Sequence, residues 1–381
     1  MMLRSLRSSL ALLIALGLPA AVSARTFVVK DGESIREAVD QASPGDTIRV
    51  KRGTYTAPPG EEYVVEVVTS DLTLIGDPGA VIEASGVEYG IMVGEDSNIT
   101  PAGCPPITVD GFRIQGFTVQ NATDTGVRLV GVRNYQLLDG RYLDNVDYGP
   151  FPICSEDGVI RGNFVSGHDD AAIYVGDDDG VLVEGNFITD STIGIEIENS
   201  ENAVVRGNVL VRNTGGVLVI AAPGLPKPFT QDVEIVGNVI VDNNRDNPFP
   251  PGPRAISLFP RGTGILNIGG DDVRIHRNFI VDNGSFGVAT IGNFFVFEDP
   301  RLEPFVDGQV VRHNAILKNG GDPDPLRLLT PPADIIFVPD LIDPTTGMVV
   351  LPDPDPSDNC YADNLFETDF PPGVVDLFPC D

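Results

Sequence analysis

Two copies of one pattern lie in RGNFVSGHDDAAIYVGDDDGVLVEGNFITDSTIGIEIENS (161–200), and four more follow along the chain. Each copy places an asparagine before a short apolar run. These asparagines are Asn163, Asn186, Asn208, Asn238, Asn278 and Asn314. The first gaps are 23 and 22 residues, and the later gaps of 30, 40 and 36 residues hold insertions. A base period of about 22 residues indicates a solenoid, in which each repeat stacks on the next.

Each period contains short β-branched runs and almost no helical pattern. In Ile195-Glu196-Ile197, for example, apolar and polar side chains alternate as they do in a half-buried strand. Three short strands and three turns fill one period, which is one coil of a right-handed parallel β-helix, with neighbouring coils about 4.8 Å apart. We therefore predict an all-β fold, a right-handed parallel β-helix of about nine or ten coils, over residues 25–320.

The repeated asparagines have a structural explanation. Tight turns need residues that tolerate the left-handed backbone region, and stacked amide side chains can hydrogen-bond from coil to coil. A second column follows five residues after the first, with His168 and Ser191 in two of its positions. Its asparagines are Asn213, Asn243, Asn283 and Asn319. We expect both columns to hold the fold together and not to take part in catalysis.

Both ends of the solenoid need covers, because an open sheet end invites pairing with other chains. Residues 33–42 place apolar side chains on one helical face, so we expect a short amphipathic helix over the first coil. Residues 321–381 lose the repeat and become rich in Pro and Asp, which predicts an irregular C-terminal cap or tail. A weak coil around Asn364 is compatible with this segment.

Residues 1–24 have the pattern of a secretory signal peptide. Basic residues come first, residues 10–18 are apolar, and a small-residue cleavage site occupies 22–24. No later stretch of 18 apolar residues exists, so we predict no transmembrane anchor. We expect the mature chain to be exported to the periplasm or outside the cell.

The charge excludes one class of partner. The chain has 25 Lys and Arg against 55 Asp and Glu, a formal net charge of −30. Nucleic-acid binding depends on basic surfaces, so we expect none. The same charge disfavours acidic polysaccharides unless cations or a local basic patch offset the repulsion.

Four cysteines in an exported chain predict disulfides. Of the three possible connectivities we favour the pairs that are local in sequence, Cys104 with Cys154 and Cys360 with Cys380. The second pair would fix the C-terminal segment.

A resemblance to a known family adds to this prediction. The stretch SIREAVDQASPGDTIRVKRGTY (34–55) and the asparagine-anchored coils resemble the pectate-lyase-like parallel β-helix superfamily. Within it, DAAIYVG (170–176), GIEIENS (194–200) and NTGGVLVIAAPGLP (213–226) resemble a family of exported parallel β-helix repeat proteins. That family has no established activity, so the resemblance implies the fold, and it also implies an exported protein partner.

A candidate site lies on the strand that follows each asparagine turn. Alternation points one file of side chains outward. The file is Arg128, Tyr174, Glu196, Leu218, Leu266 and Ala289. Glu198 should face the same way as Glu196, with His168 and Asp170 in the turn before Tyr174. The insertions 223–231 and 245–260 attach near this strand and could wall a groove for a glycan chain.

Carboxylates two residues apart on a strand are close enough to flank a glycosidic bond or share a cation. We therefore assign a catalytic role to Glu196, Glu198, Asp170, Tyr174 and His168. The alternatives are that the acids are surface charges and that His168 replaces an asparagine in the ladder. Further candidates are Arg128, Asn199 and Arg261 for substrate binding, and Asp177 and Asp179 for Ca²⁺, the one cofactor that we consider.

The motifs of known β-helix enzymes do not transfer to this chain. His168 lies in GHDD, where polygalacturonases have GHG, and the DPHD-like motif of mannuronan epimerases is absent. Pectate lyases need an Arg base beside Asp-bound Ca²⁺, and Arg128 lies two coils from Glu196 in our alignment.

Two hypotheses remain. The first is an exported enzyme acting on a polysaccharide, as a hydrolase, lyase or epimerase. The second is a non-catalytic β-helix that binds a glycan or a protein partner at the cell envelope. Acids that converge within about 5–10 Å and carry raised pKa values would favour the enzyme.

Overall fold

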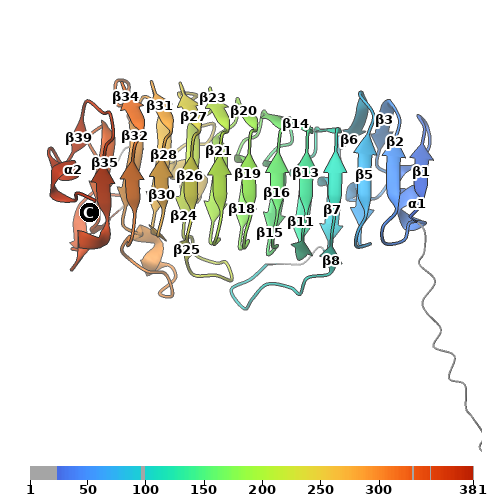
Figure 1. Cartoon of the computed structure of the whole chain (residues 1–381), viewed down its shortest axis with the longest axis horizontal. Coiled ribbons are helices and arrows are strands. Elements are labelled where there is room, and N and C mark those ends of the chain that lie inside the picture. Colours follow the sequence, from blue (N-terminus) through green and yellow to red (C-terminus); the bar gives the residue numbers. More distant parts are fainter. Residues whose placement is uncertain (1–23, 96–98, 328–329, 344, 381) are drawn as a thin grey trace, which may run out of the picture.

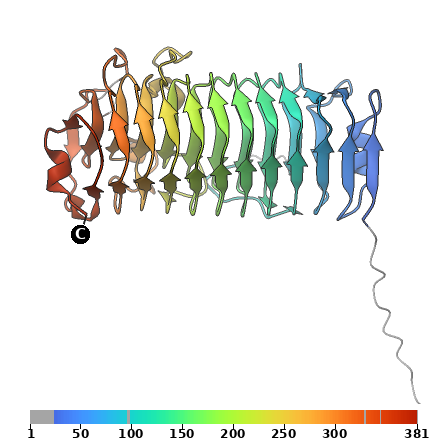
Figure 2. The same ribbon diagram turned by 45° about the horizontal axis from the view of Figure 1, so that its top comes forward.

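A computed structural model describes residues 24–380 apart from 96–98, 328–329 and 344. The chain forms an elongated stack of coils with three long parallel sheets (Figures 1 and 2). This is the all-β, right-handed parallel β-helix predicted from the sequence. The predicted signal peptide lies outside the described residues except for Ala24.

Sheets A and B contain the shorter strands. Sheet A has twelve described strands: β1 (Thr26–Val29), β2 (Thr47–Val50), β5 (Thr73–Gly76), β9 (Arg113–Gln115), β13 (Gln136–Leu138), β16 (Val159–Arg161), β19 (Leu182–Glu184), β22 (Val204–Arg206), β26 (Glu234–Val236), β30 (Arg274–His276), β33 (Val310–Arg312) and β38 (Cys360–Ala362). Sheet B has ten described strands: β3 (Gly53–Thr56), β6 (Ala80–Glu83), β10 (Thr118–Gln120), β14 (Arg141–Leu143), β17 (Phe164–Ser166), β20 (Phe187–Thr189), β23 (Val209–Val211), β27 (Val239–Val241), β31 (Phe279–Val281) and β34 (Ala315–Leu317).

Sheet C contains the strands that follow the second asparagine column. Its eleven described strands are β4 (Tyr63–Val67), β7 (Tyr89–Gly94), β11 (Thr125–Val130), β15 (Tyr148–Ile153), β18 (Ala171–Gly176), β21 (Ile193–Glu198), β24 (Gly215–Ile220), β28 (Thr263–Ile268), β32 (Phe286–Ile291), β35 (Ala333–Val338) and β39 (Asp369–Phe370). Three short pairs lie outside the long sheets: β8 (Val109–Asp110) with β12 (Val132–Arg133), β25 (Thr230–Gln231) with β29 (Gly270–Asp271), and the antiparallel β36 (Leu341–Ile342) with β37 (Val349–Leu351).

The inward residue of each strand fills the core of the solenoid. Val183, Ile195 and Ile188, one from each sheet of the same region, are fully buried. Equivalent residues of neighbouring coils pair in register, so β-branched side chains of similar size stack along the axis. One continuous apolar core therefore runs through the solenoid.

The two asparagine columns form hydrogen-bonded ladders. Asn208 is typical: its Oδ1 accepts from the backbone N–H (2.9 Å) and the Nδ2 (3.0 Å) of Asn186. Its own Nδ2 donates to the Val183 carbonyl and to Asn238 Oδ1. The second column is bonded in the same way and ends where Asn319 donates to Asp334.

The left-handed residue of these turns is not the asparagine. The preceding residue has the positive φ, as at Gly207 (63°) before Asn208 and Asp242 (53°) before Asn243. This residue lies at the bend between two sheets, and the asparagine after it is buried. The left-handed position predicted at the asparagine is therefore one residue earlier in these turns.

A short helix covers the first coil. Helix α1 (Ile35–Asp40) starts after Ser34, whose Oγ accepts from the N–H of Glu37. Ile35 and Val39 are buried in the core below. The expected N-terminal capping helix is present and is shorter than residues 33–42.

The C-terminal segment combines regular and irregular structure. β35, β38 and β39 continue sheets C and A past residue 320, and Asn364 Oδ1 accepts from Asn314. The remainder contains the β36–β37 pair, the 3₁₀ helix η3 (Pro356–Asp358) and helix α2 (Val374–Leu377). The stack thus continues into the segment that the sequence assigned to the cap.

Both disulfides expected from the sequence are present, Cys104–Cys154 and Cys360–Cys380. The first joins the loop before β8 to the end of β15, and the second joins β38 to the chain end. No helix of the described residues is long and apolar enough to cross a membrane.

Candidate active site

The outer face of sheet C is covered instead of facing water. Inward residues such as Ile173 and Ile195 belong to the solenoid core, whereas their neighbours Tyr174 and Glu196 are on the outside. Outside residues of this sheet form a second buried apolar cluster. The outward file predicted from the sequence lies on this face. Four of its members belong to the second cluster: Tyr174, Leu218, Leu266 and Ala289.

The predicted file omitted one strand, β15, which lies between the strands of Arg128 and Tyr174. Arg128 pairs with Phe151 of β15, and the Phe151 ring stacks on Tyr174 with centroids 4.3 Å apart. Arg128 therefore lies three coils from Glu196 and not two. The β15 sequence YGPFPI has two prolines and lacks the β-branched alternation, which explains why spacing alone passed over it. The Arg128 guanidinium lies over the rings of Tyr89 and Phe151.

A cavity of about 410 Å³ lies on this face. Its floor is the outer face of β21, β24, β28 and β32. Its walls come from three further parts of the chain: the insertion 251–260 with the 3₁₀ helix η1 (Ala255–Leu258), the 3₁₀ helix η2 (Phe294–Phe297), and the residues Leu326, Arg327, Thr330 and Thr345. The expected wall from insertion 245–260 is present, and insertion 223–231 contributes no lining residue.

Three carboxyl groups meet at one end of the cavity. Glu196 and Glu198 occupy successive outward positions of β21, and Asp170 lies directly before β18 in the preceding coil. The Tyr148 hydroxyl donates to Asp170 Oδ2 at 3.2 Å, and the Tyr174 hydroxyl bonds Glu198. None of the three acids forms an ion pair within the described residues.

Burial changes the protonation of these acids. Desolvation, together with the charges of Asp147 and Glu198, raises the pKa of Asp170 to about 7. Desolvation also raises the pKa of Glu198 to about 7, although the Tyr174 hydroxyl opposes this. The pKa of Glu196 is raised well above its usual range by burial and by the charges of Glu198 and Asp170. The site can therefore hold protons on carboxyl groups near neutral pH.

His168 is not brought to this cavity. Its imidazole is fully buried in the second ladder, where Nδ1 donates to the Asn145 carbonyl at 2.6 Å. Its backbone N–H donates to Ser191 Oγ. Burial lowers the pKa of His168 to about 4, so the ring stays neutral. The structure thus favours the alternative reading, in which His168 replaces a ladder asparagine.

Asn199 and Arg261 support loops. Asn199 is buried and bonds both the N–H and the carbonyl of Ala222, as well as the Lys227 carbonyl, at the base of insertion 223–231. The Arg261 guanidinium pairs with Asp322 (3.1 Å) and Asp246 (3.7 Å). Neither residue lines the cavity.

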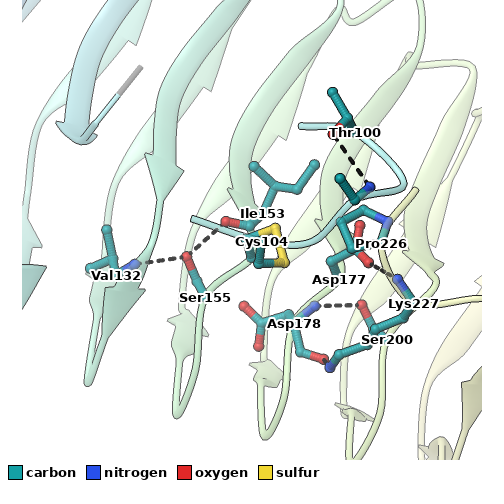
Figure 3. The surroundings of a disulfide bond; sticks show 12 residues. Thr100, Cys104, Val132, Ile153, Ser155, Asp177, Asp178, Ser200, Pro226 and Lys227 are labelled. Carbon is teal, nitrogen blue, oxygen red and sulfur yellow. Dashed lines mark hydrogen bonds between the residues drawn. A yellow bond between two sulfur atoms is a disulfide. The ribbon is translucent and has the colours of Figure 1, made fainter. Parts of the chain in front are cut away.

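Asp177 and Asp179 do not form a ligand cluster. Asp177 Oδ1 accepts from the backbone N–H of Lys227 at 2.7 Å, an arrangement visible in Figure 3. Asp179 Oδ1 accepts from Asn202. In the part of the chain that the structure describes, no three His, Cys, Asp or Glu side chains are grouped as metal ligands.

Several lining residues were missing from the sequence prediction. Tyr148 had a signal, because it lies 22 residues before Asp170, one coil earlier. Arg254 and Arg327 had no such sequence signal, because they reach the cavity from segments outside the repeat pattern. Their place in one cavity, and not the number of acids in the chain, distinguishes Glu196, Glu198 and Asp170 from the other acidic residues.

The known proteins that are similar to this chain share its β-helix fold. The model of the family described as "Right handed beta helix region" matches residues 89–280, half of the chain. Among curated proteins, the SPbeta prophage-derived uncharacterized protein YomE of Bacillus subtilis (strain 168) is 21% identical over 127 residues, or 32% of this chain. The chain spans about a fifth of that relative's length, 20%.

Solved structures with the same fold are distant in sequence. The A-module of Azotobacter vinelandii mannuronan C-5 epimerase AlgE4 has a TM-score of 0.61 at 14% identity, covering 87% of this chain and 88% of that one. The AlgE6 A-module has 0.59 at 17%, covering 79% and 73%. The tailspike protein of E. coli bacteriophage HK620, in complex with pentasaccharide, has 0.57 at 13%, covering 81% and 56%. Identities this low show the fold alone.

Proposed function

This chain belongs to the right-handed β-helix family, and from that premise we propose that the cavity on sheet C is the active site of an enzyme that hydrolyses a glycosidic bond. The observation that carries the proposal is the meeting of Asp170, Glu196 and Glu198 in one cavity, all with raised pKa values. Glycosidases use a pair of carboxyl groups, one protonated and one ionised.

Glu196 is the proton donor in this proposal. Burial, together with the charges of Glu198 and Asp170, raises its pKa well above the usual range, the residue is 8% exposed, and it lines the cavity. A neutral carboxyl group at pH 7 can protonate the oxygen of the leaving group, as a general acid must.

Glu198 is the ionised partner. The Tyr174 hydroxyl stabilises its charged form, and its pKa of about 7 leaves it partly ionised at neutral pH. When the bond from the anomeric carbon to the leaving oxygen breaks, Glu196 gives its proton to that oxygen. Water supplies the new oxygen on the anomeric carbon, and Glu198 takes the proton that the water loses. Asp170, held by Tyr148, orients the sugar.

Two relatives of the same fold support a glycan as the substrate. One is named as a mannuronan C-5 epimerase and another is a tailspike in complex with pentasaccharide. Hydrolysis is preferred over lyase chemistry because Arg128, the candidate base, is three coils away from Glu196. Export is part of the proposal, and two disulfides are typical of an oxidising compartment. An exported protein partner and a Ca²⁺ ion stay predictions.

The test is turnover by the purified mature chain on a panel of glycosides and polysaccharides, with Ca²⁺ or with a chelator. We expect Glu196→Gln to lower kcat about 100-fold or more, the usual contribution of a general acid. Asp169→Asn is the matched control, because Asp169 neighbours Asp170 in sequence but does not line the cavity.

Equal loss in both variants would assign the effect to surface charge and contradict the proposal. Glycan binding without turnover on any substrate would favour the second candidate, a non-catalytic glycan-binding scaffold.

A further inference from the structure

The cavity has two ends of different chemistry. The carboxyl groups lie at the β18 and β21 end. The other end is apolar, with outward side chains of three further strands below and buried residues of η1, η2 and their flanks above. They include Leu218, Leu266, Ile268 and Ala289 below, and Phe259 and Phe294 above.

The apolar end is unusual for an outer sheet face. Protein interiors are close-packed and contain few voids larger than a water molecule, because unfilled space beside apolar groups costs stability. Here apolar side chains that are 5–6% exposed, such as Leu218 and Leu266, line a cavity of about 410 Å³. A cavity of this size and lining is typical of a site for a small molecule with an apolar part.

A polar group in the same cavity also points to a ligand. Glu196 is more than nine-tenths buried and lines the cavity, and its carboxyl group forms neither a hydrogen bond nor an ion pair with another described residue. Its carboxyl group is therefore available to a bound molecule, at the boundary between the polar and apolar ends.

We propose that the substrate is a glycoside whose leaving group is an apolar alkyl or aryl group, with the sugar beside Asp170, Glu196 and Glu198 and the leaving group over β24, β28 and β32. This inference rests on the proposed function for the polar end. Three coil steps separate β21 from β32, roughly 14 Å along the solenoid axis. That length suits one sugar with an attached hydrocarbon.

The assignment also gives the direction of cleavage. The proton from Glu196 goes to the oxygen that joins sugar and hydrocarbon, so an apolar alcohol is released into the apolar end and the sugar hemiacetal forms at the polar end. An internal sugar unit of a long polysaccharide would place hydroxyl groups against the apolar side chains of Leu266 and Ile268.

The experiment is isothermal titration calorimetry with paired probes that resist hydrolysis. Octyl and methyl 1-thio-glycosides of glucose, galactose and mannose are compared, each below its micelle-forming concentration. For at least one sugar we expect the octyl compound to bind about 100-fold more tightly than the methyl compound, the change expected when about four methylene groups leave water.

Two variants test the location. Leu266→Gln makes the floor polar, and Ala289→Leu fills the apolar end without making it polar; each should reduce the octyl preference at least about 10-fold. Leu365→Gln is the matched control, because Leu365 is 61% exposed and lies outside the cavity. Melting temperatures show which variants are folded, and Ala289→Leu keeps the test valid if Leu266→Gln does not fold.

The outcomes separate this inference from the proposed function. Equal binding of octyl and methyl compounds, no binding of any octyl compound, or an octyl preference that survives both variants overturns the inference. Turnover of a polysaccharide with no octyl preference leaves the hydrolase and overturns the apolar leaving group. An octyl preference without turnover of any glycoside supports the apolar site and overturns the hydrolase.

Discussion

The carboxyl groups of the cavity link function to the stability of the fold. Asp170 and Glu198 keep their protons in the folded state up to a pKa of about 7, whereas in the unfolded chain they lose them near pH 4. Between these values the folded state binds more protons, so stability falls as pH rises from about 4 to about 7.

The double variant Asp170→Asn, Glu198→Gln should lose this decline. We expect it to be more stable than the wild type at pH 8, by on the order of 2–4 kcal/mol, and similar to it at pH 4. Denaturant unfolding between pH 4 and pH 8 measures the difference. Identical pH profiles for the two proteins would show that the acids are solvated.

The pKa of His168 changes stability with pH in the opposite direction from the pKa values of Asp170 and Glu198. Its folded pKa is lowered to about 4, so the unfolded chain binds a proton below about pH 6.5 and the folded chain does not. Stability from this group is present at neutral pH and is lost as pH falls towards 4.

His168→Asn should restore the ladder and remove this loss. We expect unchanged turnover and stability within about 1 kcal/mol of wild type at pH 7, with higher stability than wild type at pH 5. Unfolding at both pH values and a turnover assay measure this. A large loss of turnover in a folded variant would return His168 to the catalytic candidates.

At the scale of single elements, the asparagine ladders stabilise the turns between the sheets. Asn208 satisfies two donors of Asn186 as well as the Val183 carbonyl, all of them buried. The Asn208 side chain therefore satisfies two buried backbone groups of the preceding coil.

Asn208→Ala should cost about 2–5 kcal/mol, because the change leaves several buried polar groups without partners. Gln115→Ala is the control: it removes side-chain hydrogen bonds to Arg113 and Asp139 that are part-buried or exposed, and should cost less than about 1 kcal/mol. Denaturant unfolding compares the two. Similar losses would mean that the ladder is not the main support of the turn.

At the scale of the whole molecule, the walls of the cavity are held by contacts between distant parts of the chain. Arg327 donates to the carbonyls of Phe249 and Ser257 and pairs with buried Asp324. The segment after β34 is thereby fixed to the insertion after β27, which lies 70 to 78 residues earlier.

Arg327→Ala should open the cavity and leave the solenoid intact. We expect faster limited proteolysis within residues 245–260 and at least about 10-fold weaker octyl glycoside binding, since the walls no longer close over the apolar end. The circular dichroism of the sheets should not change. Unchanged proteolysis and binding would show that apolar packing alone holds the walls.

Much of the architecture was determined by the sequence. Each coil contacts only its neighbours, so a period of 22 to 23 residues, the asparagine columns and the alternation in Ile195-Glu196-Ile197 predicted the coils, the ladders and the outward direction of Glu196. The disulfides followed from pairing cysteines that are near in sequence.

Only the tertiary structure decided what the outward face does. The walls come from insertions without a repeat, held by bonds such as that from Arg327 to Phe249, and no periodicity predicts such contacts. They make Glu196 a buried acid, while the turn geometry places His168 in the ladder. Burial depends on all the segments that meet at a point, whereas a repeat depends on neighbouring coils alone, so the sequence determined the solenoid and the three-dimensional packing determined the site.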